Sequence, residues 1–159
     1  MTMIIDGSAG VTFPNSTVQA SAGVVLQVVN ATTNTSVSNS TNTEADTTLT
    51  ATITPKFATS KILVIVDQNG IYKDTSNTYM GLKLYRNATP ILLFENYAGV
   101  TSTTSVNGVG GGGCAYLDSP ATTSAVTYKT TVYSGGNVAR VIIQVNNEYS
   151  TITLMEIAG

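Results

Sequence analysis

Short runs of alternating apolar and polar residues follow one another from residue 24 to the end of the chain, and turn-forming residues separate them. A period of two is typical of strands, and no run has the period and caps of a helix. Turn signals such as Asn69-Gly70 and Gly135-Gly136 recur roughly every ten to fifteen residues, a spacing that favours a sandwich or barrel over βαβ units. We therefore predict an all-β, antiparallel β-sandwich. The expected strands cover residues 24–30, 35–39, 47–54, 60–67, 79–86, 90–97, 113–118, 126–133, 139–147 and 150–157.

Several of these strands are apolar on both faces. In residues 62–66 every side chain is apolar, and residues 91–94, 141–145 and 152–157 repeat the pattern. One face of a two-layer sandwich normally meets water, so a doubly apolar strand indicates contact with another subunit. A homotrimer is the assembly we expect, with Leu154, Met155 and Ile157 at its interface. The alternative is a monomer with generous apolar content.

Residues 1–23 differ in character from residues 24–159, and we treat them as two parts of the chain. The first five residues hold no Lys or Arg and only a short apolar run, so they lack the form of a secretion signal. Gly7, Gly10 and Pro14 oppose a helix. An extended segment that docks on a partner is the prediction. Its candidate attachment residues are Ile4, Ile5, Val11, Phe13 and Val18.

Composition limits the partners. Charged residues make up 10% of the chain, the formal net charge is −2, and the seven basic residues are scattered. Binding to nucleic acid relies on clustered Lys and Arg, so nucleic acid is not an expected partner. No apolar run reaches the length of a membrane-spanning helix. At 159 residues the chain can bury a sizeable core without a metal or cofactor, and we expect none.

The sequence offers few candidate catalytic residues. The chain has no histidine, and its one cysteine, Cys114, is expected to be a small buried thiol at the start of a strand. Paired carboxylates could cleave glycosides, but the chain has no tryptophan with which to build a sugar-stacking cleft. The glycine run 108–113 lacks the Lys and Ser or Thr of a phosphate loop and predicts a loop or a close backbone crossing. Residues 67–77 lack the order of an EF-hand and predict a polar loop more than a calcium site.

Tyrosine and asparagine side chains near predicted loops are candidates for recognition. Tyrosine combines a rigid ring with a polar hydroxyl at low entropic cost, although core packing explains any single tyrosine equally well. Strand-connecting loops gather at the two ends of a sandwich, and three segments are candidates for a recognition surface at one end: residues 71–77, 98–108 and 133–137. The residues singled out are Tyr72, Asn77, Tyr97, Asn107 and Tyr133.

The segment IDGSAGVTFPNSTVQASAG resembles the "GVTFPDGTxQ-SA" leader of many tailed-phage fibre and virion-appendage proteins, with Asn15-Ser16 where Asp-Gly is more usual. Residues 24–37, 48–67 and 150–159 resemble the terminal domain that commonly follows that leader. The resemblance implies a virion protein with a jelly-roll head similar to the tumour-necrosis-factor and C1q heads. It also implies that residues 1–23 bind other virion proteins.

We therefore expect a trimeric phage fibre or appendage that attaches the virion to a host-surface glycan or protein by multivalent binding, without catalysis. A capsid decoration protein that stabilises the particle is the main alternative. A glycan-cleaving fibre tip and a secreted adhesin are the others.

Overall fold

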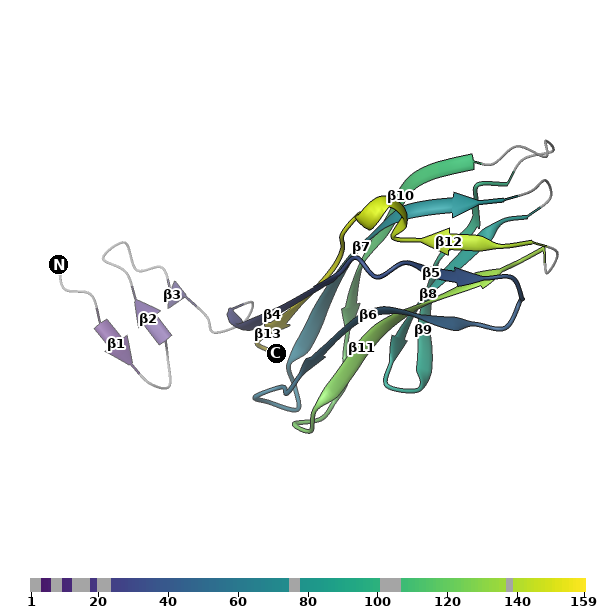
Figure 1. The fold of residues 1–159 in the computed structure, drawn as a ribbon. Coiled ribbons are helices and arrows are strands. Elements are labelled where there is room, and N and C mark those ends of the chain that lie inside the picture. Colours follow the sequence, from purple (N-terminus) through teal and green to yellow (C-terminus); the bar gives the residue numbers. More distant parts are fainter. Residues whose placement is uncertain are drawn as a thin grey trace.

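The computed structural model describes residues 4–6, 10–12, 18–19, 24–74, 78–100, 107–136 and 139–159, with side chains described from Val24 onward except at Asn107. From Val24 the chain forms an antiparallel β-sandwich (Figure 1). This confirms the predicted fold class. The strands are β4 (Val25–Thr33), β5 (Val37–Asn39), β6 (Ala45–Ile53), β7 (Lys61–Lys73), β8 (Met80–Arg86), β9 (Thr89–Ala98), β10 (Asn107–Asp118), β11 (Val126–Ser134), β12 (Val141–Ile143) and β13 (Ser150–Ile157).

The connectivity of the two sheets is that of a jelly roll. One sheet has the order β4-β13-β7, to which β10 adds on the other side of β7, and the second has the order β6-β11-β8-β9. Among the described residues, eight strands have seven or more residues. When these eight strands are numbered 1 to 8 in chain order, the orders of the two sheets are 1-8-3-6 and 2-7-4-5. Two interleaved Greek keys of this kind define the jelly roll. The short strands β5 and β12 extend the first sheet beside the second half of β7.

The described residues of the N-terminal part form a small antiparallel sheet. Its strands are β1 (Ile4–Asp6), β2 (Gly10–Thr12) and β3 (Val18–Gln19), with Ile5 opposite Val11 and Thr12 opposite Val18. Of the candidate attachment residues, Ile4, Ile5, Val11 and Val18 lie in these strands, and Phe13 lies outside the described residues.

Buried polar side chains divide the core of the sandwich into two parts. One apolar cluster contains Ile62, Val64, Tyr128 and Leu154, and a second contains Ile71, Met80, Leu82, Val132 and Ile143. The change from the first cluster to the second passes the buried Gln68 on β7 and the buried Thr130 on β11.

The polar residues between the clusters are hydrogen-bonded to one another. Gln68 Nε2 donates to Gln144 Oε1 at 2.7 Å and to Ser150 Oγ at 2.9 Å, and Thr130 Oγ1 donates to Gln68 Oε1 at 2.9 Å. The hydroxyl of Thr47 bonds to that of Thr130. All five side chains are fully or almost fully buried. A buried polar group costs free energy unless it is paired, and this layer meets that condition.

Connections between strands gather at two ends of the sandwich. At the end that we call the base, the chain enters at Val24 and finishes at Gly159, and the Ala158 amide donates to the Val24 carbonyl at 2.9 Å. The opposite end, the tip, carries the connections β7–β8, β9–β10 and β11–β12 (Figure 1). The pairing of Met80 with both Ala98 and Ser134 brings one end of each of these three connections together. The described parts of the three segments expected to face a host, within residues 71–77, 98–108 and 133–137, therefore share the tip.

Two local predictions near η1 were wrong, because the backbone takes positive φ within a bulge at Gly70 and at Gln144. The strand β7 continues through the predicted turn at Asn69-Gly70. Gly70 has φ +64°, and a Cβ there would lie 2.5 Å from the Val145 nitrogen. The expected strand 139–147 covers only β12, because Gln144 has a positive φ and a 3-10 helix η1 (Val145–Asn147) follows.

The glycine run 108–113 is a strand and not a loop. It forms the first half of β10, paired along β7, so residues 67–73 are also strand and not the expected polar loop. A Cβ on Gly113 would lie 2.5 Å from the Val66 carbonyl oxygen, so the close backbone approach that the run predicted is present within one chain.

Candidate functional sites

The outward faces of the two sheets differ in chemistry. The outer face of the sheet containing β4, β13, β7 and β10 carries a band of apolar side chains among polar ones, whereas that of the sheet β6-β11-β8-β9 carries tyrosines and charged side chains. An apolar face suits contact with another protein subunit, and a polar aromatic face suits reversible recognition.

One row of apolar residues crosses all four strands of the first sheet. Met155 lies opposite Val28 on one side and Leu63 on the other, and Leu63 lies opposite Leu117. Val28 is 55% exposed and Leu117 is 51% exposed, and Ile65 in the next row is 38% exposed. We call this row and the adjoining Ile65 the apolar row; its residues are Val28, Leu63, Ile65, Leu117 and Met155. Neighbouring outward residues on one face act as a unit, so the row offers one continuous surface.

The predicted subunit interface is corrected by this placement. Leu154 points into the core of its own chain and is fully buried there, so it cannot contact a partner subunit. Met155 and Ile157 are partly buried and lie on the opposite face of β13. Within one chain, therefore, β7 is covered on one face only: Ile62 and Val64 are buried, and Ile65 is exposed.

Three tyrosines gather near the tip on the second sheet. The rings of Tyr79 and Tyr97 stack with their centroids 4.4 Å apart and their planes 26° apart, and Tyr97 is 59% exposed. Tyr133 donates a hydrogen bond of 2.6 Å to Asn96 Oδ1. We call Tyr79, Asn96, Tyr97 and Tyr133 the tyrosine cluster. Desolvation and the adjacent Tyr97 hydroxyl raise the pKa of Tyr79, so its hydroxyl is neutral at physiological pH.

Glycines on neighbouring strands hold two of these rings in place. A Cβ on Gly81 would lie 2.0 Å from Tyr133 Cζ, and one on Gly135 would lie 1.8 Å from Tyr79 Cε2. Each ring therefore occupies the space over a glycine of the adjacent chain segment. This arrangement requires glycine at both positions, because any larger residue would displace a ring.

A balanced set of charges adjoins the tyrosine cluster. Glu44 accepts hydrogen bonds from Lys83 and from the Tyr85 and Thr131 hydroxyls, and Lys83 Nζ lies 5.5 Å from the centre of the Tyr133 ring. Burial alone would raise the pKa of Glu44, but these hydrogen bonds and the Lys83 charge outweigh it and lower the pKa. The Glu44 carboxylate raises the pKa of Tyr85 to about 12.

The recognition candidates proposed from sequence are only partly brought together. Tyr97 and Tyr133 are in the tyrosine cluster, where Tyr79 joins them. Tyr72 lies on β7, in the other sheet, opposite Gly108. Asn77 lies outside the described residues, and only the backbone of Asn107 is described.

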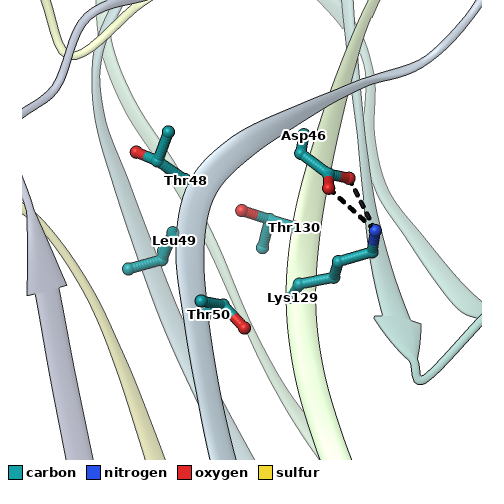
Figure 2. Close-up of a pocket in the computed structure, with 6 residues that line it drawn as sticks. All are labelled: Asp46, Thr48, Leu49, Thr50, Lys129 and Thr130. Atoms are coloured by element: carbon teal, nitrogen blue, oxygen red, sulfur yellow. Dashed lines mark hydrogen bonds and ion pairs between the residues drawn. The ribbon is translucent and has the colours of Figure 1, made fainter.

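A small hollow of about 110 Å³ lies where β6 and β11 separate (Figure 2). Asp46 and Lys129 form an ion pair at its side, and Thr48 and Leu49 line it. Between the pairs Asp46–Thr131 and Thr50–Lys129, three residues of β6 face one residue of β11. Thr48 there has φ +68°, a conformation that β-branched residues rarely adopt.

Replacing Thr48 with glycine is expected to stabilise the chain by about 1 kcal/mol, because glycine adopts positive φ without strain. The hydroxyl that is lost bonds to Thr33 at an exposed position, where such a bond contributes little. It also accepts a long hydrogen bond of 3.5 Å from Gln144 Nε2, but that nitrogen keeps its shorter bonds to the Thr35 and Thr47 carbonyls. Thermal unfolding would measure the change. The control is Thr50→Gly two residues along, where glycine in ordinary strand conformation should destabilise. Destabilisation by both variants would contradict the assignment of strain to Thr48.

A second cavity, of about 360 Å³, lies at the base. It is lined by Val24, Leu26, Phe57, Thr59, Ala158 and Gly159. Phe57 is more than half exposed there. This apolar hollow adjoins the point where residues 1–23 join the head, although sequence reasoning did not single out any residue of its lining.

Several carboxylates of the described residues form ion pairs. Asp46, Asp74 and Asp118 pair with Lys129, Arg140 and Arg86. In the parts of the chain that the structure describes, no three His, Cys, Asp or Glu side chains converge as a metal site would require, and no helix is long and apolar enough to span a membrane.

Cys114 lies in the middle of β10 and not at a strand start, partly buried against the first core cluster. Burial raises the pKa of its thiol to about 11. The thiol is therefore protonated at neutral pH, a state that does not act as a nucleophile.

Neither the family models nor the curated proteins with which the sequence was compared include a match to this chain.

Proposed function

We propose that this chain is a structural protein of a tailed-phage virion, a homotrimeric fibre or appendage that attaches the particle to the host surface by binding without catalysis. The observation that carries the proposal is the position of the tyrosine cluster at the tip, opposite the base where residues 1–23 join the head. A protein with its anchoring segment at one end and its recognition surface at the other can bridge two partners.

Residues 1–23 supply the link to other virion proteins in this proposal. Their resemblance to phage leaders supports that role, and the apolar cavity at the base offers adjacent surface for the same contact. Ile4, Ile5, Val11, Phe13 and Val18 are the residues that we propose for attachment.

The apolar row supports assembly from several copies. Val28, Leu63, Ile65, Leu117 and Met155 form a patch that water covers in an isolated chain, and burying it against neighbouring copies would stabilise the assembly. Three copies around an axis present three tyrosine clusters in one direction. Simultaneous binding then converts weak single contacts into strong attachment.

Light scattering on the purified chain tests the assembly, and the expected mass is about 50 kDa for three copies of 16.5 kDa. The labelled chain should also bind cells of the bacterium that the phage infects and compete with phage adsorption. A stable monomer at micromolar concentration would contradict the trimer. Failure to bind cells or to compete would contradict host attachment.

Capsid decoration is the second candidate, and the exposed Phe57 beside the base cavity favours it, because such a surface could seat the head on a capsid shell. Imaging of the intact virion separates the two functions. Decoration predicts high copy number over the shell, whereas attachment predicts projection from the tail or a vertex.

A further inference from the structure

We infer that the tyrosine cluster is a binding site for an uncharged saccharide built of pyranose rings. The inference rests on the proposed attachment function and names the class of ligand that the tip recognises.

The stacked pair provides the surface for a sugar ring. Tyr97 is 59% exposed and is backed by the Tyr79 ring at 4.4 Å, so an aromatic face reaches solvent from a supported position. The face of an aromatic ring carries negative partial charge, and the C–H groups on one face of a pyranose carry positive partial charge. The two surfaces are therefore complementary in shape and in charge.

The cluster is also held in place before any ligand arrives. Tyr133 lies over Gly81 and is tied to Asn96 by a 2.6 Å hydrogen bond, and Tyr79 lies over Gly135. Rings whose positions are already fixed lose little conformational entropy on binding. This matters for a saccharide, because each contact with a hydroxyl replaces a contact with water and contributes little alone.

Polar groups around the rings match the hydroxyls of a sugar. Asn96 is exposed, and among the described residues no hydrogen bond uses its amide nitrogen, so this donor is available to a ligand. Tyrosine hydroxyls donate and accept hydrogen bonds, as sugar hydroxyls do. A few polar groups beside an apolar surface are the usual means by which a binding site orients its ligand.

The charges next to the cluster favour an uncharged ligand. Lys83 and Glu44 are paired, and so are Arg140 and Asp74 nearer the tip connections. An anionic polymer would need positive charge in excess, and these paired residues provide no such excess.

Binding of the full-length chain to an array of neutral oligosaccharides of glucose, galactose, rhamnose and N-acetylglucosamine tests the inference. Wild type should bind at least one of these, and Tyr97→Ala should weaken that binding at least tenfold. Tyr97→Phe keeps the ring and should retain most of the binding. The matched control is Tyr149→Ala, which removes an equally exposed tyrosine (61%) outside the cluster and should have no effect.

Gly135→Ala gives a second test, in which no tyrosine is removed. Its methyl group would occupy the place of Tyr79 Cε2, so the ring must move and saccharide binding should fall while the circular dichroism spectrum stays unchanged. Absence of binding to every neutral saccharide overturns the inference, and so does equal binding by wild type and Tyr97→Ala.

The outcomes for the ligand and for the proposed function are separable. Cell attachment by wild type without any saccharide binding rejects the ligand class and leaves the attachment function standing. Saccharide binding that Tyr97→Ala abolishes, in a chain that attaches to no cell, rejects host attachment and retains the site.

Discussion

Replacement of Met155 with aspartate is expected to convert the proposed trimer into a folded monomer, with the mass in light scattering falling from about 50 kDa to 16.5 kDa. Met155 lies in the middle of the apolar row, between Val28 and Leu63. An unpaired carboxylate enclosed between apolar surfaces costs several kcal/mol to desolvate, and each subunit of a trimer would carry one.

Two further variants make this result interpretable. Because Met155 is partly buried in the isolated chain, Leu117→Asp provides an independent test at a position that is half exposed and should not disturb folding. Thr52→Asp on the outer face of the other sheet is the control and should remain trimeric. If the wild-type chain is trimeric and both Met155→Asp and Leu117→Asp stay trimeric, the apolar row is not the subunit interface.

Loss of the Glu156 carboxylate is expected to cost about 3 kcal/mol of unfolding free energy and to lower the melting temperature by roughly 8 °C. Glu156 is fully buried near the base. It accepts hydrogen bonds of 2.6 Å from Gln27 Nε2 and 2.7 Å from the Lys56 amide. Glu156→Ala leaves both donors without this acceptor. Thermal unfolding measures the effect, and the control Glu148→Ala removes an exposed glutamate and should change little.

The same carboxylate predicts how stability depends on pH. Burial alone would raise the pKa of Glu156, but the hydrogen bonds that it accepts outweigh burial and hold the pKa below 4.5. A group whose pKa is lower in the folded state contributes stability above its unfolded pKa and loses it as the pH falls through the folded value. Stability should therefore decline below about pH 4.5. Glu156→Gln should reduce this decline, leaving the part due to Glu44, and an unchanged pH profile would contradict the assignment.

The fold was largely predictable because strand alternation is a local signal. Residues 150–157 show this well: the alternation of Ile152 and Leu154 with Met155 and Ile157 matches the inward and outward faces of β13. The inward position of Glu156 follows from the same alternation, but its hydrogen-bond donors come from distant β4 and the β6–β7 connection. Alternation alone does not show that a glutamate at an inward position is buried, because burial of its charge depends on those donors.

The tyrosine cluster could be predicted only in part. Tyr97 and Tyr133 were recognised as tyrosines near loops, but the stacking partner Tyr79 depends on bulges between β8 and β9 that shift their register. The roles of Gly81 and Gly135 depend in the same way on which ring lies above each of them. Such pairings between strands are set by tertiary structure, and a local sequence pattern does not contain them.

The buried layer of Gln68, Thr130 and Gln144 has a consequence for how this protein can evolve. Because polar residues separate the buried members of the two apolar clusters, side chains near the tip pack mainly with one another, although the partly buried Phe94 contacts both clusters. Substitutions that reshape the tip therefore need few compensating changes elsewhere, since distant sites contribute to stability almost additively. Recombination that exchanges the tip at this layer would replace the proposed binding surface without rebuilding the base.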